Sequence, residues 1–185
     1  MEQRVCPWYM GYLLASPLRR LYQDPVTILS PYVRTGMNVL EVGPGMGFFS
    51  LPMARLIGDQ GKVYSIDLQE RMLHSLRKRA VKNKLQHIIN ARQCSQDSLE
   101  VKDLSNKIDF ALAFAVVHEI LDKQNLFREI YDSLRQGGVL LISEPRDHVS
   151  KEAFQEFLSI AESIGFSFTE VPAIKGSLSV VLKKA

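Results

Sequence analysis

Uninterrupted apolar runs alternate along this chain with segments in which apolar residues recur at every third or fourth position. An apolar run predicts a strand buried on both faces, and the three-to-four spacing predicts a helix that buries one side. The runs predict strands over 37–42, 62–67, 87–93, 108–117 and 137–144, and the spacing predicts helices over 17–32, 48–57, 69–83, 122–134 and 150–164. This alternation is the pattern of an α/β protein with a parallel sheet.

The last part of the chain departs from the alternation. Two segments, 166–171 and 177–182, are separated by a link that is too short to hold a helix. We therefore expect them to pair antiparallel as a hairpin at the edge of the sheet. Apolar residues at an edge over 177–182 would permit a homodimer without requiring one, so both a monomer and a homodimer are allowed.

Length and composition predict one compact domain. The chain has 185 residues, 46% of them hydrophobic and 23% charged, and it contains no repeat or low-complexity linker. The net charge of +3 is small, and the main basic run, 77–84, falls on a predicted helix. We interpret that run as a solvated helix face, so nucleic acid is not an expected partner.

Two further features bear on location. Cys6 and Cys94 are far apart and belong to no Cys/His cluster, so we expect no metal site and a reducing, cytoplasmic setting. The apolar segment 5–14 is interrupted by a proline and a glycine and is too short to span a bilayer as a helix. We therefore expect neither a cleaved signal peptide nor integral membrane association.

The segment VLEVGPGMGFFS, residues 39–50, joins the first predicted strand to the next helix and has three glycines at alternate positions. Gly43, Gly45 and Gly47 fall at the carboxyl end of the strand, where open parallel sheets bind ligands. Glycine tolerates positive φ and has no β-carbon, so a ligand can lie against the backbone. A tight turn with close helix packing is the alternative explanation.

The spacing of these glycines argues against phosphate. A dinucleotide fingerprint places its third glycine where Phe48 stands, and a Walker loop ends in Gly-Lys-Ser/Thr where Phe48 and Phe49 stand. Glu41, two residues before the first glycine, would repel a pyrophosphate and attract a cationic ammonium group. The turn therefore predicts a ligand with positive charge and disfavours an NAD-binding reductase.

Asp67 ends the second predicted strand, 20 residues after Gly47. An acid at this place in the topology accepts hydrogen bonds from ribose hydroxyls. The alternative is that Asp67 caps the helix over 69–83. Together with Glu41, it predicts a ligand with a ribose, a positive amino-acid portion and no pyrophosphate.

Four motifs in this order resemble those of class I S-adenosylmethionine-dependent methyltransferases. They are VLEVGPGMGFFS, VYSIDLQERML, DFALAFAVVHEI and LRQGGVLLISEP, and the resemblance covers about residues 36–145. It implies a Rossmann-like three-layer sandwich with a seven-stranded, mostly parallel sheet and an antiparallel last strand. In this reading 1–35 are an N-terminal helical cap, 36–145 the cofactor-binding core, and 146–185 a C-terminal helix and hairpin.

The resemblance also implies roles for particular residues toward S-adenosylmethionine. Glu41 would hold the methionyl ammonium group, and the three glycines would line the amino-acid portion and the sugar. Asp67 would bind the ribose hydroxyls, and Leu68 would contact the adenine.

Two positions depart from the pattern of this family. Where relatives often carry a Gly-Asp-Ala-like segment against the adenine, this chain has Cys94-Ser95-Gln96, so Ser95 or Gln96 would provide the hydrogen bond. At the end of the fourth strand, where many relatives have a polar residue, Phe114 stands instead.

Methyl transfer to an acceptor depends chiefly on alignment of the two reactants, so a general base is not obligatory. If the acceptor must lose a proton, His118 is the candidate base, because it follows the fourth strand and titrates near neutrality. Glu119 is a candidate to orient the imidazole. The alternative is that His118 packs over the cofactor or bonds to the backbone.

The acceptor is expected to be a small molecule. The N-terminal segment could form a lid through a set of aromatic and aliphatic residues, or it could simply pack on the sheet. The residues of this segment are Trp8, Tyr9, Tyr12, Leu13 and Leu14. Arg146 and His148 follow the fifth strand and either hold an anionic acceptor or face water.

Two function hypotheses remain from the sequence. The first is an enzyme that transfers a methyl group from S-adenosylmethionine to a small-molecule acceptor. The second is a non-catalytic module that binds S-adenosylmethionine, or an interaction module that only keeps the methyltransferase-like fold.

Overall fold

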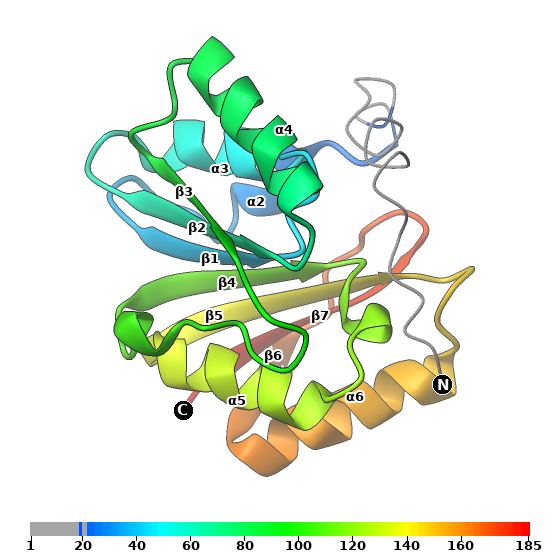
Figure 1. The fold of residues 1–185 in the computed structure, drawn as a ribbon. Helices are drawn as coiled ribbons and strands as arrows, with labels where there is room; N and C mark the ends of the chain where they lie inside the picture. Colours follow the sequence, from blue (N-terminus) through cyan, green and yellow to red (C-terminus); the bar gives the residue numbers. More distant parts are fainter. Residues whose placement is uncertain (1–18, 20–21) are drawn as a thin grey trace. The chain divides into compact units, whose positions relative to one another are not determined.

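The computed structural model describes Arg19 and residues 22–185 (Figure 1). These residues fall into two compact units, one that ends at Cys94 and one that runs from Ser95 to Ala185. The seven strands have the order β3-β2-β1-β4-β5-β7-β6 in the sheet. No helix in the described part of the chain is both long enough and apolar enough to cross a membrane.

The first unit is a parallel sheet with helices between its strands. Its elements are α2 (Pro25–Leu29), β1 (Asn38–Val42), α3 (Ser50–Ile57), β2 (Lys62–Asp67), α4 (Glu70–Lys82) and β3 (Ile89–Gln93). Strand β2 lies between β1 and β3, and its register aligns Ser65 with Glu41 and Asp67 with Gln93. The three predicted strands of this unit are confirmed, with the start of β3 two residues later than the sequence predicted.

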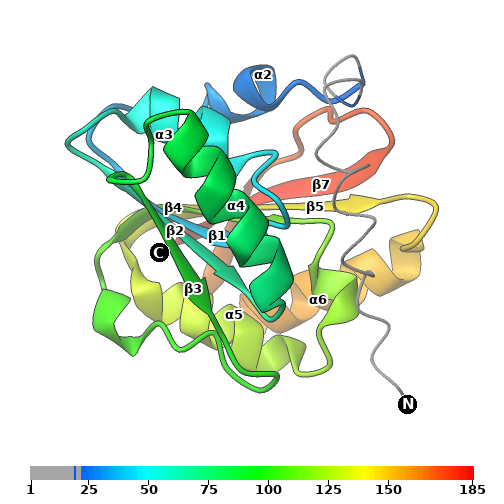
Figure 2. The ribbon, with the colours of Figure 1, turned by 45° about the horizontal axis from the view of Figure 1, so that its top comes forward.

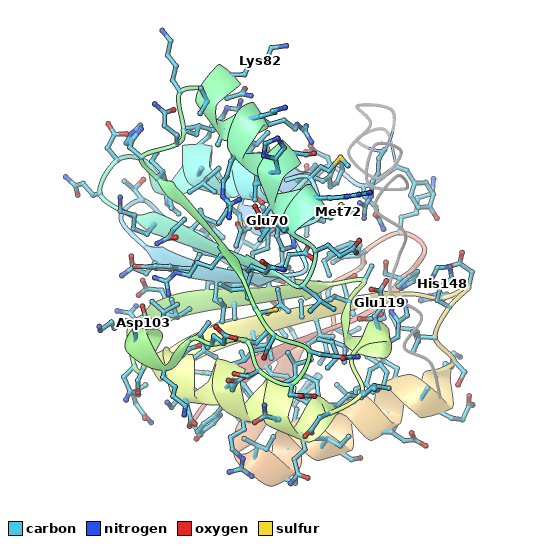
Figure 3. All side chains as sticks on the ribbon, viewed as in Figure 1. Glu70, Met72, Lys82, Asp103, Glu119 and His148 are labelled. Carbon is cyan, nitrogen blue, oxygen red and sulfur yellow. The ribbon has the colours of Figure 1, made fainter. Side chains whose placement is uncertain are left out.

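Helix α4 shows why the periodicity of the sequence was informative. Its buried residues recur at three-to-four spacing and are Met72, Leu73, Leu76 and Ala80. The opposite side of the helix is charged, and the side chain of Lys82 projects away from its end (Figure 3). Figure 2 shows this helix lying across β2 and β3, against which the apolar stripe packs.

The predicted helix over 17–32 is shorter in the described residues. Helix α2 begins at Pro25, because the Asp24 carboxylate accepts a hydrogen bond from the backbone N–H of Thr27 at 3.0 Å and so caps the first turn. Proline suits this first helical position because it has no N–H to satisfy. The helix ends at Leu29, directly before Ser30 and Pro31.

The second unit joins parallel and antiparallel strands. Its elements are the 3-10 turns η2 (Lys102–Leu104) and η3 (Val117–Glu119), the strands β4 (Ile108–Phe114), β5 (Leu134–Pro145), β6 (Phe166–Glu170) and β7 (Ser177–Lys184), and the helices α5 (Lys123–Ser133) and α6 (Lys151–Ile164). Strands β4 and β5 are parallel, and β7 is antiparallel to both β5 and β6. Helices α5 and α6 lie side by side (Figure 1).

The predicted strand over 108–117 ends earlier than its apolar sequence suggested. Strand β4 stops at Phe114, and Ala115 has a φ of +56°, in the left-handed region that ends an extended strand. Val117 is fully buried within the 3-10 turn η3. Its apolar side chain therefore serves the packing of the turn and not a longer strand.

The antiparallel hairpin at the edge of the sheet is confirmed, but its outer strand is not the one over 177–182. Strand β7 lies between β5 and β6, so residues 177–182 do not form an edge. The edge strand of this unit is β6, whose Phe168 has 58% of its surface exposed. Residues 177–182 are therefore not available as the edge through which two copies could pair.

Lys184 anchors the end of β7 although lysine seldom occurs inside a protein. Its side chain is buried, and its Nζ donates to Tyr131 O at 2.8 Å, to Leu134 O at 2.8 Å and to Asn106 Oδ1 at 3.0 Å. The same ammonium group lies 4.7 Å from the centroid of the Tyr131 ring. Strand β7 is thus tied to the end of α5 and the start of β5.

We expect Lys184→Ala to lower the free energy of unfolding by about 2–4 kcal/mol, because it leaves buried oxygen acceptors without a donor. Lys183→Ala is the matched control, since that neighbouring side chain is exposed, and it should change stability by less than about 0.5 kcal/mol. Urea denaturation followed by circular dichroism measures both variants. Equal stability of the two variants would contradict an anchoring role.

Candidate functional site

The glycine turn after β1 combines a tight packing position with an open one. Gly43, Gly45 and Gly47 have φ values of +68°, +54° and +88°. A β-carbon on Gly47 would lie 2.5 Å from Cδ1 of Leu76, whereas one on Gly45 would meet no atom within 4 Å. Close helix packing therefore explains Gly47, while Gly45 leaves free space along the backbone of the turn.

The turn is held in place from two sides. The Gly43 N–H donates to the carbonyl of Ile66 at 2.9 Å, and Arg79 Nη1 donates to the carbonyl of Met46 at 2.6 Å. The first bond ties the turn to β2 and the second ties it to α4. The loop is therefore fixed before any ligand arrives, which lowers the entropy lost on binding.

Glu41 lies on β1 with only 2% of its surface exposed. The strand register places Ser65 beside it, and Ser50 approaches from the first residue of α3. Both hydroxyls donate to the same carboxylate oxygen, Oε2, with 2.9 Å for Ser65. Within the described residues no donor reaches the second oxygen, Oε1. A buried carboxylate with one oxygen satisfied and one left over is arranged to meet a positively charged donor.

The electrostatics of Glu41 agree with this arrangement. Burial raises the pKa of Glu41 to about 7, against the opposing effect of the hydrogen bonds from Ser50 and Ser65, and the negative charge of Asp67 raises it further. Without a cationic partner the carboxylate therefore holds its proton up to neutrality. A bound ammonium group would stabilise the ionised form.

Asp67 connects the two loops at the ends of β1 and β2. Its Oδ2 accepts a hydrogen bond from the Gly45 N–H at 3.2 Å, and its Oδ1 accepts one from the Gln69 N–H at 2.8 Å. The second bond joins Asp67 to Gln69, the N-cap residue of α4, whose own side chain makes no capping hydrogen bond. Leu68, which follows Asp67 in the chain, is half-buried, and its carbonyl accepts a hydrogen bond from Gln93 Nε2 at 3.1 Å. The structure thus brings Glu41, the glycine turn, Asp67 and Leu68 into one unit.

Three predicted cofactor residues belong to the second unit. Ser95 and Gln96 are exposed, and Ser95 Oγ donates to the carbonyl of Ser98 at 3.3 Å. Phe114 is buried at the end of β4, with 9% of its surface exposed. Their roles toward the adenine stay predictions.

His118 is held by a residue that the sequence reasoning missed. Its Nδ1 is hydrogen-bonded to Oε2 of Glu144, which lies near the end of β5 and is completely buried. The other oxygen, Oε1, accepts from the backbone N–H groups of Val116 at 3.1 Å and Val117 at 2.7 Å. Glu144, and not the predicted Glu119, therefore orients the imidazole. Glu144 lies at the carboxyl end of β5 and His118 follows the carboxyl end of β4, and these two strands are parallel neighbours.

The surroundings of His118 contain several charged or titratable groups. Burial and the positive charge of Lys123 lower the pKa of His118. The hydrogen bond and charge of Glu144 and the charge of Glu119 raise it, and they prevail, so the pKa lies above 6.5. The ring of His148 packs edge-on at 5.4 Å between centroids. Figure 3 labels Glu119 and His148 on the loops that follow β4 and β5. The imidazole is thus more basic than in water.

Arg146 and His148 were predicted either to hold an anionic acceptor or to face water, and within the described residues only Arg146 makes a hydrogen bond to another part of the chain. Arg146 Nε donates to the carbonyl of Ser177 at 3.0 Å, which links the loop after β5 to the start of β7. Both side chains are otherwise exposed. Whether they bind an acceptor stays a prediction, and the predicted lid from Trp8 to Leu14 lies outside the described residues.

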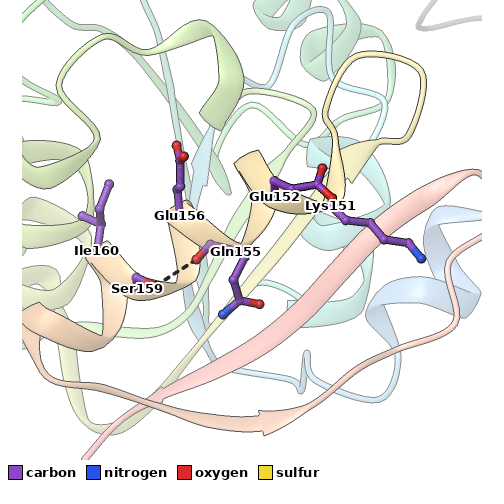
Figure 4. Close-up of a pocket in the computed structure, with 6 residues that line it drawn as sticks. All are labelled: Lys151, Glu152, Gln155, Glu156, Ser159 and Ile160. Atoms are coloured by element: carbon purple, nitrogen blue, oxygen red, sulfur yellow. Dashed lines mark hydrogen bonds between the residues drawn. The ribbon is translucent and has the colours of Figure 1, made fainter.

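A surface hollow follows the exposed side of α6 and contains none of the predicted site residues. Its lining comes from one helix and consists of Lys151, Glu152, Gln155, Glu156, Ser159 and Ile160 (Figure 4). Gln155 and Ser159 are joined there by a hydrogen bond within the helix, from Ser159 Oγ to the Gln155 carbonyl at 3.1 Å. In the portion of the chain with described coordinates, no three His, Cys, Asp or Glu side chains are grouped to bind a metal ion.

Comparison with known proteins identifies the family of this chain. A family model described as a methyltransferase domain matches residues 34–172. The ubiquinone/menaquinone biosynthesis C-methyltransferase UbiE of Cellvibrio japonicus is 30% identical over 80% of this chain and 59% of its own length, and that of Hahella chejuensis is 29% identical over 91% of this chain and 64% of its own length. The chain therefore spans about three fifths of the length of these relatives.

Solved structures show the same fold. A SAM-dependent methyltransferase from Aquifex aeolicus superposes with a TM-score of 0.87 at 23% identity, covering 98% of this chain and 100% of that one. A putative S-adenosyl-L-methionine-dependent methyltransferase from Methanococcus maripaludis gives 0.81 at 18% identity, with 100% and 97% covered. The predicted Rossmann-like fold with its seven-stranded sheet is confirmed. Because the family model matches well over half of its residues, this chain belongs to the family of methyltransferase domains.

Proposed function

We propose that this protein transfers a methyl group from S-adenosylmethionine to a small-molecule acceptor. The observation that carries the proposal is buried Glu41, whose Oε1 meets no donor among the described residues and which lies on the strand that leads into the glycine turn. A ligand with an ammonium group satisfies that oxygen, and a ligand with a pyrophosphate does not. The names of the curated relatives support a small molecule as the acceptor.

The residues present fit S-adenosylmethionine. Glu41 holds its ammonium group, the glycine turn carries the amino-acid portion, and Asp67 binds the ribose hydroxyls. Leu68, Ser95, Gln96 and Phe114 surround the adenine in this proposal. The bound cofactor supplies a methyl group made electrophilic by its positively charged sulfur.

His118 acts in this proposal as the base that removes a proton from the acceptor. A neutral imidazole with Nδ1 held by Glu144 has Nε2 left to accept that proton. Alignment of the reactants provides the larger part of the acceleration, about 7–11 kcal/mol in well-oriented reactions. The base adds about 10²-fold to 10⁴-fold where the acceptor must be ionised.

The two compact units act together as one methyltransferase domain in this proposal, which the family match supports because it runs through residues of both. A cytoplasmic location, and the choice between monomer and homodimer, stay predictions.

Isothermal titration calorimetry with S-adenosylhomocysteine and with NADH tests the cofactor. We expect heat with the first ligand and none with the second, and the reverse would overturn the proposal. Transfer of a labelled methyl group from S-adenosylmethionine to the small-molecule fraction of a cell extract tests turnover. Binding of S-adenosylhomocysteine without any transfer would favour the non-catalytic module.

A further inference from the structure

The Glu144 carboxylate forms its hydrogen bonds with three consecutive residues. Its Oε1 accepts from the N–H groups of Val116 and Val117, and its Oε2 bonds to Nδ1 of His118. The side chain has no exposed surface, so water does not compete for these bonds. A carboxylate fixed by two backbone donors has only one oxygen left, and that oxygen meets the imidazole.

The fold explains how residues 26 positions apart come together. Strands β4 and β5 are parallel neighbours, and their register pairs Phe114 with Ser143, the residue before Glu144. The Ala115 N–H donates to the Ser143 carbonyl at 2.7 Å, after which the left-handed Ala115 turns the chain. The 3-10 turn that follows then presents its N–H groups and His118 to Glu144.

We propose that Glu144 is the positioning residue for His118, because it fixes the imidazole so that Nε2 is the nitrogen that takes a proton from the acceptor. This inference rests on the proposed function. The Glu144 carboxylate accepts a hydrogen bond from Nδ1–H, which keeps the ring proton on Nδ1, so the neutral ring has Nε2 unprotonated and held in a fixed direction. His118 Nε2 would take the proton of the acceptor's nucleophilic group as that group bonds to the methyl carbon. The electron pair of the broken carbon–sulfur bond stays on sulfur.

The groups around the imidazole set the sign of its pH dependence. Glu144 from β5 and Glu119 favour the imidazolium, Lys123 from α5 opposes it, and His148 packs against the ring. Because the pKa of His118 is raised, kcat should increase as pH rises through a value above 6.5, where the ring becomes neutral. Loss of the Glu144 charge should move this rise in kcat to lower pH.

Glu144→Gln tests the pair. The glutamine oxygen can keep the two backbone bonds, but its NH₂ group would donate to Nδ1 and force the ring proton onto Nε2. We expect kcat to fall about 10-fold to 100-fold, with KM for S-adenosylmethionine changed by less than about threefold. Glu119→Gln is the matched control, because it removes a neighbouring charge without touching the Glu144 bond, and its kcat should stay within about threefold of wild type.

Nuclear magnetic resonance of ¹⁵N-labelled histidines gives the readout that a purely structural role would not move. The chain has four histidines, and His118→Asn assigns the signal. We expect wild-type His118 to carry its proton on Nδ1 when neutral, and Glu144→Gln to carry it on Nε2. The wild-type measurement decides the pairing even if Glu144→Gln fails to fold.

The outcomes separate the two proposals. A wild-type protein that transfers methyl groups but carries the His118 proton on Nε2 would overturn this inference alone. Equal kcat values for folded Glu144→Gln and Glu119→Gln would do the same. A wild-type protein that binds no S-adenosylhomocysteine would overturn the proposed function and, with it, the catalytic use of His118, while the resonance data still determine the Glu144–His118 pairing.

Discussion

Glu41→Gln is expected to make the ligand-free protein more stable at pH 8 and, at the same time, to weaken its binding of S-adenosylhomocysteine. The two effects have one origin, which is a carboxylate with only 2% of its surface exposed and with two hydroxyl donors on one of its oxygens. Glutamine fills the same volume without a charge. Its amide can still bond to the Ser50 and Ser65 hydroxyls, because a hydroxyl both donates and accepts.

The stability effect follows from proton linkage. The pKa of Glu41 is 4.5 in the unfolded chain and about 7 in the folded one, so between these values the folded state binds more protons. Stability is therefore greatest below about pH 4.5 and is lost as pH rises through about 7. At 1.36 kcal/mol per pKa unit, the ionised carboxylate costs about 3 kcal/mol at pH 8. Glu41→Gln should recover about that amount at pH 8 and almost none at pH 4.5, as measured by urea denaturation.

The binding effect has the opposite sign. Loss of a buried charge-assisted hydrogen bond should weaken S-adenosylhomocysteine about 10-fold to 100-fold at pH 8. 5′-Methylthioadenosine lacks the ammonium group, so its affinity should be the same for the wild type and the variant. Glu70→Gln, at an exposed carboxylate of the same unit, is the protein control. An equal loss of affinity for both ligands would show that Glu41 supports the loop and does not contact the ammonium group.

Gly47→Ala is expected to destabilise the protein by about 3 kcal/mol. The φ of +88° disfavours any residue with a β-carbon, and the new methyl group would lie 2.5 Å from Leu76 Cδ1, which is completely buried in the apolar stripe of α4. Left-handed strain contributes about 1–2 kcal/mol, and overpacking contributes about 1–3 kcal/mol. Chemical denaturation measures the sum.

Two controls separate the contributions to the Gly47 effect. Gly45→Ala adds the same methyl group in open space at a φ of +54°, so only the strain of about 1 kcal/mol should appear. Gly47→Ala in a Leu76→Ala background removes the atom that is struck, so the added penalty should fall to the strain alone. If Gly45→Ala and Gly47→Ala are equally destabilising, the contact with Leu76 does not matter.

Periodicity in the sequence was sufficient wherever one element buries one clear face. The stripe of α4 and the bounds of β2 agree with the prediction to within a residue or two. It was insufficient at Val117, because an apolar residue in a packed turn looks the same as one in a strand. It also misplaced β7, since a hairpin pattern does not say which of its two strands pairs with the rest of the sheet.

The candidate site shows the same contrast between what a local segment predicts and what strand pairing decides. Glu41, the glycines and Asp67 could be predicted as site residues because each stands in one local segment, where spacing indicates the chemistry. Their supporting residues were not found. Ser65 reaches Glu41 through the register of two strands, and Glu144 reaches His118 through another pair. Register depends on how strands pair across long stretches of chain, and residue order alone does not specify it.

The position of β7 between β5 and β6 has a consequence for how the second unit folds. Strand β5 pairs with residues about 40 positions further along the chain, for example Val139 with Lys183. Of the described strands, β6 pairs only with β7, so it cannot join the sheet before β7 has paired with β5. Until then, the apolar face and unpaired edge of β5 are open to other chains. The sheet of this unit is therefore completed only when the last residues of the chain, 177–184, pair with β5.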